Sequence, residues 1–197
     1  MENAAAAAEA DAAAVHLFVR RPDMPRINKL MGIGSPGFTH GFPELPAAWR
    51  WRIMHYSFAT QTPAPRGSTL RLSRHATAHF RFGHAVERVE AVGDGLRVDT
   101  SKGRYELDFL ILGTGFSVEP TARDEFGAAA FEIACWEDRF TPPAGWESRE
   151  LGRFPYLQPD FAFTEKTPGR APWLTDVHCV NSAATLRPAT ASGDIPA

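Results

Sequence analysis

Cysteine is scarce in this sequence, and neither sign of charge is in large excess. Only two cysteines, Cys135 and Cys179, occur among 197 residues, too few for a disulfide framework, so a reducing cytoplasm is the expected location. The formal net charge of -2 gives no reason to expect nucleic acid or an anionic membrane as a partner. The longest apolar stretch, residues 109–118, is far too short to cross a bilayer. The alanine-rich start carries acidic Glu2 and Glu9, which a signal peptide would not.

Motifs for metal binding or nucleophilic catalysis are lacking as well. His75, His79 and His84 lie close in sequence, in a segment that we expect to form strands. No cysteine or carboxylate completes a ligand set around them, so no metal site is expected. The sequence has neither a G-x-S-x-G nucleophile elbow nor a C-x-x-C redox pair. The residues alone therefore single out no catalytic acid, base or nucleophile.

The composition is that of a globular chain. Apolar residues make up 44% of the sequence, and the length suits one domain with a real core. Glycine and proline, 16 of each, crowd residues 22–65 and 142–172. A compact domain rarely has such long connections. These stretches are therefore either functional loops over a cleft or parts of something larger.

The first residues predict the back half of a β-α-β unit. Residues 1–10 are nearly all strong helix formers, and Asp11 can take the left-handed conformation that ends a helix. Residues 15–19 are β-branched and aromatic and predict a buried strand, which Arg20 and Arg21 follow. In a doubly wound nucleotide fold the tip of this strand meets the adenosine ribose, where arginine accepts the 2′-phosphate of NADP. The alternative is a solvated basic pair at a strand end.

The middle of the chain predicts an antiparallel β-meander. Residues 70–72 and 79–82 alternate, and the segments 86–92, 96–100 and 104–107 are joined by glycine turns. Residues 109–112 form a continuous apolar run, which predicts a strand buried on both faces, a neighbour or near-neighbour of strand 15–19 in one sheet. The expected fold class is therefore α/β, a partial doubly wound nucleotide-binding fold with an antiparallel β-meander.

Three later segments have weaker signals. A short helix is expected near residues 46–58, helical structure around 123–131, and a further strand at 177–180. The literal G-x-G-x-x-G at residues 32–37 is expected to be a decoy. No clean strand precedes it, and no helix is expected after it, so its amides would not face a pyrophosphate.

The residues then resemble a known family. Residues 108–116, DFLILGTGF, resemble the D-x-x-I-x-A/G-T-G-F/Y segment of two-dinucleotide-domain flavoproteins, above all flavin-containing monooxygenases and related NADPH hydroxylases. The resemblance extends to Arg20-Arg21-Pro22 and to the segments 181–185 and 192–196. It implies that two arginines bind the NADPH 2′-phosphate and that four later residues contact the flavin: Arg20, Arg21, Thr114, Gly115, Asn181 and Asp194.

The resemblance also implies a domain division and two cofactors, FAD and NADPH. Residues 1–116 would be a remnant of the NAD(P)H-binding domain with the meander, and residues 117–197 the loop-rich C-terminal part of the FAD-binding domain. Because no glycine fingerprint for FAD is present, we expect an N-terminal FAD-binding segment as a partner. Without it the chain is expected to be inactive.

The function implied is that of a monooxygenase acting on a small molecule. NADPH reduces FAD, and the reduced flavin activates oxygen, while the protein positions the cofactor. Two alternatives stay open. One is a flavoprotein reductase that does not hydroxylate, although the redox cysteine pair of disulfide reductases is missing. The other is a truncated, non-catalytic protein with an NAD(P) fold.

Overall fold

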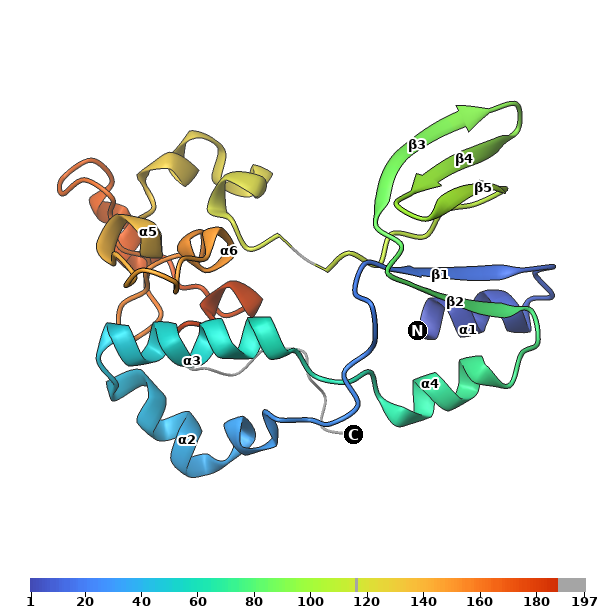
Figure 1. Ribbon diagram of the computed structural model, residues 1–197. Coiled ribbons are helices and arrows are strands. Elements are labelled where there is room, and N and C mark those ends of the chain that lie inside the picture. Colours follow the sequence, from blue (N-terminus) through green and yellow to red (C-terminus); the bar gives the residue numbers. More distant parts are fainter. Residues whose placement is uncertain (116, 188–197) are drawn as a thin grey trace. The chain divides into compact units, whose positions relative to one another are not determined.

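A computed structural model of the chain describes residues 1–115 and 117–187, and they divide into two compact units. Unit 1 consists of Met1–Asn28 and Thr62–Thr114, and unit 2 of Lys29–Gln61 and Gly115–Ala197. The chain therefore leaves unit 1 for one excursion and returns to it before crossing again (Figure 1). The assignment of the expected domains to NADPH and FAD stays a prediction.

The base of unit 1 is a pair of parallel strands with two helices. The chain order is α1 (Glu2–Glu9), β1 (Val15–Val19), α4 (Arg66–Ser73) and β2 (Ala78–Phe82). The strands pair in parallel from Val15 opposite Ala78 to Val19 opposite Phe82. Asp11 ends the first helical stretch with a φ of 61°, as predicted. The helix and strand expected before Arg20 are confirmed.

Charge and packing join the two helices of unit 1. Arg71 of α4 bonds to both Glu2 and Glu9 of α1, with its Nε 2.7 Å from the Glu9 Oε1. This hydrogen bond lowers the pKa of Glu9. Beneath it Ala5 and Leu72 are fully buried. Residues 70–72, which were expected to be extended, are thus helical. An exposed arginine followed by a buried leucine is compatible with a helix as well as with a strand.

Three antiparallel strands complete unit 1 (Figure 1). They are β3 (Val86–Val92), β4 (Gly95–Thr100) and β5 (Gly103–Leu107), paired in the order β3-β4-β5. Gly93 has a φ of 59° in the turn between the first two, a conformation in which glycine has no steric cost. Tyr105 of β5 packs edge-on against Phe18 of β1, with ring centroids 4.8 Å apart. This aromatic contact anchors the antiparallel sheet to the parallel pair.

The strand predicted at residues 109–112 is wrong. These residues have no strand structure, and β1 pairs with β2 instead. Phe109 is 87% exposed and Leu112 is 74% exposed. A strand buried on both faces needs a hydrogen-bonded neighbour, and no described strand lies beside this segment to accept its backbone bonds.

Unit 2 consists of helices and loops around an aromatic core. Its α-helices are α2 (Pro36–Gly41), α3 (Ala47–Thr60), α5 (Trp136–Arg139) and α6 (Arg149–Gly152). Its 3₁₀ turns are Met31–Gly34, Phe42–Glu44, Pro120–Ala122, Asp124–Glu132, Pro172–Asp176 and Ser182–Ala184. One core cluster gathers seven buried side chains: Phe42, Trp51, Met54, Trp136, Leu151, Phe154 and Leu186. None of the helices described in either unit is both long and apolar enough to span a bilayer.

The remaining expectations in unit 2 have mixed outcomes. The helix expected near residues 46–58 is α3, and helical turns cover most of 123–131. The strand expected at 177–180 is wrong, because this segment forms only a single bridge between His178 and Ala162. Its apolar residues face different surroundings: Cys179 is buried in a second core cluster, whereas Val180 is exposed.

Candidate functional site

The carboxyl ends of β1 and β2 form the candidate site of unit 1. Because the strands are parallel, both end at the same edge, where open α/β sheets bind ligands. The backbone continues the pairing past the strands: the Gly83 amide donates to the Arg21 carbonyl at 2.7 Å, and the His84 amide to the Val19 carbonyl at 3.0 Å. Arg20 and Arg21 therefore stand at this edge, as the sequence predicts.

A third cation reaches the edge from the turn between β4 and β5. The Lys102 ammonium donates to the Phe82 carbonyl at 3.0 Å. It lies so close to the backbone that a Cβ on Gly83 would come within 2.5 Å of the Lys102 Nζ. The hydroxyl of Ser101 fixes the same turn by donating to the Gly83 carbonyl at 3.0 Å. Sequence reasoning missed Lys102, because nothing local shows that its turn folds back to the edge.

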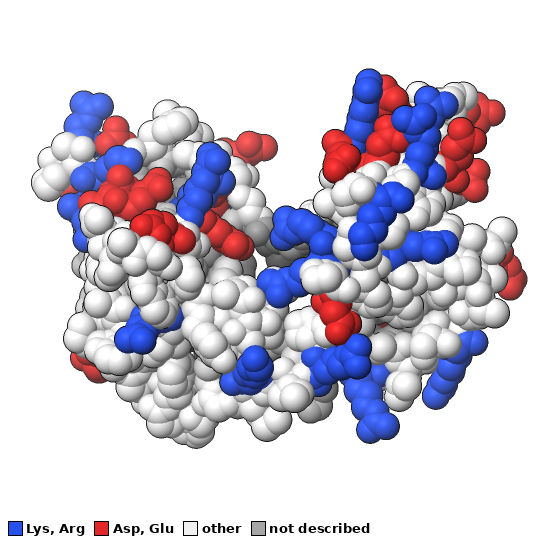
Figure 2. Space-filling view, in the orientation of Figure 1, with Lys and Arg blue, Asp and Glu red and all other residues white. Residues whose placement is uncertain are grey.

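The edge has the electrostatic character of an anion site. Figure 2 shows Lys and Arg side chains gathered around the end of the parallel pair. Within the part of the chain that the structure describes, neither Arg20 nor Lys102 forms an ion pair with a carboxylate. Guanidinium and ammonium groups without such a partner suit phosphate, the first through bidentate bonds and the second as a point charge.

Hydrogen bonds hold two histidines beside the edge in place. The Nδ1 of His84 faces the Phe82 carbonyl at 3.1 Å and its Nε2 faces the Tyr105 hydroxyl at 3.0 Å. A carbonyl only accepts, so the His84 Nδ1 carries a proton and donates to it. Burial, followed by the charge of Arg81, lowers the pKa of His16, whose Nδ1 accepts from the Arg81 Nε at 3.2 Å. These side chains support the edge and add no negative charge to it.

The residues expected at the flavin lie in other surroundings. Thr114 is the last residue of unit 1, and Gly115 opens unit 2 with a φ of +88°, which favours glycine. The Asn181 side chain accepts from the Ala183 amide at 2.9 Å and caps a 3₁₀ turn. Asp194 lies outside the described residues. The flavin contacts of these four residues stay a prediction.

The G-x-G-x-x-G at residues 32–37 differs from a phosphate loop in one respect and resembles it in another. Its first two glycines lie in a 3₁₀ turn with no strand in front. A helix does follow, which the sequence reading did not expect: α2 begins at Pro36, with Ser35 accepting from the Phe38 amide at 3.4 Å. Proline suits the first turn of a helix because its missing donor would have no partner there.

Comparison with known proteins finds one flavin-dependent hydroxylase similar in sequence and another hydroxylase similar in fold. No model of a known protein family matches it. It is 31% identical over 185 residues to a FAD-dependent urate hydroxylase from Xanthomonas campestris pv. campestris, a match covering 94% of this chain and 39% of that protein. The chain thus spans about two fifths of the length of this curated relative.

A solved structure supports the same fold. The chain is similar to ornithine hydroxylase from Pseudomonas aeruginosa in its reduced form, with a TM-score of 0.52 and 14% identity, over 88% of this chain and 40% of that one. At this identity the likeness concerns the fold alone. The sequence match confirms the resemblance to flavin monooxygenases, and the structural match shows a similar mixed α/β fold.

Proposed function

We propose that this chain supplies the NADPH-binding region, and part of the flavin surroundings, of an FAD-dependent hydroxylase acting on a small molecule. The observation that carries the proposal is the 31% identity to a FAD-dependent urate hydroxylase, which extends over 94% of the chain. Urate, the substrate in that relative's name, is the first candidate to test. Unit 1 would then be part of a doubly wound nucleotide-binding fold, with β1 and β2 as two of its parallel strands.

NADPH fits the donors at the carboxyl edge of the parallel pair. Arg20, Arg21 and Lys102 offer several N–H donors and three positive charges, which suits the 2′-phosphate that distinguishes NADPH from NADH. When bound, NADPH supplies the hydride that reduces the flavin. The task of these side chains is to hold and orient the adenosine end, and to favour the phosphorylated cofactor.

The described residues provide less for FAD. Among residues 1–115 and 117–187, no glycine-rich turn connects a strand to a helix, so the backbone lacks the usual cradle for a pyrophosphate. Thr114, Gly115, Asn181 and Asp194 would contact the flavin only as complements to such a cradle. The chain on its own is therefore expected to be colourless after purification, and added FAD should keep its free-solution fluorescence.

Cofactor preference tests the proposed NADPH site. We expect Arg20→Ala/Arg21→Ala to weaken NADPH binding by at least about tenfold, or about 1.4 kcal/mol, because charge-assisted bonds to the phosphate are lost. Binding of NADH should change little. Calorimetric titration of both cofactors measures this. Arg74→Ala is the matched control, since Arg74 is an exposed arginine of unit 1 that precedes β2 and lies away from its carboxyl end.

Some outcomes of these measurements would contradict the proposed function. Equal losses for NADPH and NADH in the double variant would contradict the role of the two arginines. To test the hydroxylase itself, the chain is joined to an N-terminal FAD-binding segment and supplied with NADPH and urate. Oxygen uptake with hydroxylated product supports the proposal. NADPH oxidation without product would favour the reductase, and a chain that binds neither cofactor would favour the non-catalytic alternative.

A further inference from the structure

An open aromatic groove in unit 2 has no part in the cofactor site described above. It encloses about 620 Å³, a volume typical of sites for small molecules. A second hollow of about 170 Å³ adjoins it. Three side chains line both hollows: Trp49, Arg52 and Trp146. The first two lie on α3, three residues apart and hence on one face of the helix, and the third comes from the loop before α6.

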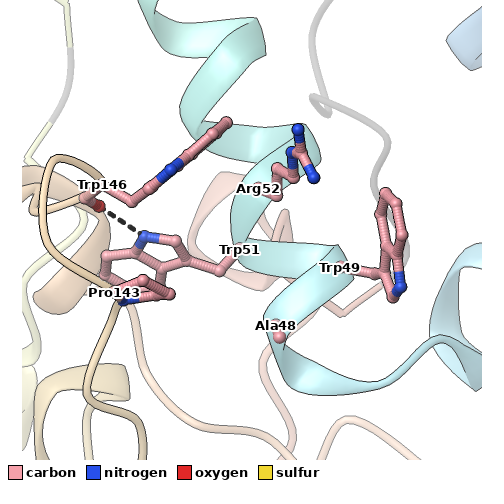
Figure 3. A pocket seen from close by; sticks show the side chains of 6 residues that line it. All are labelled: Ala48, Trp49, Trp51, Arg52, Pro143 and Trp146. Carbon is pink, nitrogen blue, oxygen red and sulfur yellow. Dashed lines mark hydrogen bonds between the residues drawn. The ribbon is translucent and has the colours of Figure 1, made fainter.

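The Arg52 guanidinium stands between the two indole rings (Figure 3). Its Cζ is 5.4 Å from the ring centroid of Trp49 and 4.9 Å from that of Trp146. Such cation–π contacts fix the position of the charge without neutralising it. Across the described residues, no carboxylate forms an ion pair with Arg52. The groove therefore contains a positive charge in a fixed position, whose guanidinium N–H groups can donate to a ligand.

A second arginine on α3, Arg50, has different surroundings from those of Arg52. The Arg50 guanidinium is half-buried over Trp136, 4.9 Å from the ring centroid, and its Nη1 donates to the Leu186 carbonyl at 3.5 Å. Burial lowers the pKa of Arg50. Arg50 thus belongs to the core of unit 2, whereas Arg52 faces the groove.

The walls of the groove are fixed from behind. The indole N–H of Trp51 donates to the Trp146 carbonyl at 2.7 Å, as the dashed line in Figure 3 shows. Trp51 itself is only 2% exposed, so a core side chain holds the backbone that carries one aromatic wall. Gly145 precedes this wall with a φ of +84°, and its amide donates to the Glu147 carboxylate at 2.8 Å. A site held in this way loses little entropy when a ligand binds.

The lining selects a class of ligand. Its two charged members, Lys29 and Arg52, are both cations, and no carboxylate lines either hollow. Apart from Ser35, the rest is aromatic or apolar, including Phe38 and Tyr56. Indole faces favour flat rings, and the guanidinium favours an anion. We propose that this groove binds a planar aromatic anion, whose ring lies against the indole walls and whose negative charge pairs with Arg52.

This inference deepens the proposed function and rests on it in one respect only, the identity of the ligand as the substrate. Urate is a flat ring system that carries a negative charge at neutral pH, so it belongs to the proposed class. Binding itself requires neither FAD nor NADPH. The experiment can therefore be done with the chain alone, and its outcome is separate from that of the hydroxylase assay.

Equilibrium dialysis with two matched pairs of probes tests the groove. Urate is compared with caffeine, a neutral N-methylated purine, and nicotinate with nicotinamide, its neutral amide of nearly the same shape. We expect the anion of each pair to bind more tightly. Arg52→Gln should weaken binding of the anions by about tenfold, the equivalent of about 1.4 kcal/mol, and leave the neutral probes nearly unchanged. Trp49→Leu should weaken all four probes, because it removes a stacking surface.

Two control variants separate the groove from general effects of charge and aromatic loss. Arg149→Gln removes an exposed arginine of α6, and Trp173→Leu removes a half-exposed tryptophan of the turn Pro172–Asp176; both residues lie in unit 2 outside the groove. Neither should change binding. The proposal is overturned if the unaltered chain binds neither anion, or if Arg52→Gln and Arg149→Gln have equal effects. If anions bind as expected but the joined protein does not hydroxylate urate, the proposed function is wrong, whereas the proposed anion binding by the groove is upheld.

Discussion

The hydrogen bond between Trp51 and the Trp146 carbonyl leads to a quantitative prediction. Trp51→Phe removes the donor of a 2.7 Å bond in the core of unit 2 and leaves the carbonyl without it. Losing one partner of a buried bond costs about 1–2 kcal/mol. The smaller ring also leaves space against Trp136 and Phe140, whose centroids lie 6.0 and 5.4 Å from Trp51. Such a large-to-small change in a packed core adds about 1 kcal/mol.

The expected loss of unfolding free energy is therefore about 2–3 kcal/mol. With a urea dependence of about 2 kcal/mol per molar, the midpoint should fall by about 1–1.5 M. Tryptophan emission is a suitable probe, because all five tryptophans of the chain lie in unit 2. The signal thus follows this unit alone, whatever unit 1 does.

The neighbouring Trp49 is the matched control for this prediction. It lies on the same helix but is 53% exposed and makes no comparable core contact. Trp49→Phe should change the free energy of unfolding by less than about 0.5 kcal/mol. If Trp51→Phe and Trp49→Phe unfold at the same urea concentration, the buried bond does not stabilise the unit, and the reasoning about the rigid wall of the groove fails with it.

Three further predictions concern protonation and exposure. Burial, and then the nearby carboxylates of Asp138 and Glu137, raises the pKa of the Cys135 thiol to about 11, so a disulfide reagent at pH 8 should label it slowly in the folded chain and rapidly in urea. The pKa of His16 is lowered on folding, so its contribution to stability is present above its ordinary pKa near 6.5 and is lost as the pH falls below that value; urea titrations by circular dichroism should show a smaller acid-side loss for His16→Asn. Phe109→Ser/Leu112→Ser should leave the urea midpoint of the chain unchanged, because both side chains are exposed.

Short-range signals account for most of what the sequence predicted correctly. The helix ending at Asp11 and the turn at Gly93 depend on local backbone preferences, which a few residues define. The helical residues 70–72 were mistaken for a strand, because three alternating residues are too few to distinguish the two periods. Pairing between β1 and β2 was also missed, since the strands are separated by the whole excursion into unit 2.

The candidate sites show the same division between local and distant information. Arg20 and Arg21 are predicted from the sequence because the end of a strand in a nucleotide-binding topology faces the cofactor. Lys102 reaches the same edge only through the folding of the antiparallel sheet onto β1. In the groove, the spacing of Trp49 and Arg52 on a helix was visible in the sequence, but Trp146 lies far along the chain. In the folded unit its carbonyl accepts a hydrogen bond from Trp51.

Residues 109–112 show why an apolar run does not by itself specify a strand. Hydrophobicity expresses how much free energy burial would release, whereas a strand requires a neighbouring backbone to bond with. The run has the first property, but in the described chain it pairs with neither β1 nor β2 and is left exposed. The double substitution Phe109→Ser/Leu112→Ser distinguishes a buried strand from an exposed segment. In a buried strand, losing Phe109 and Leu112 would cost several kcal/mol, roughly 3–5 for the aromatic ring alone. In the observed structure the same change removes side chains that touch little, so stability should not depend on them.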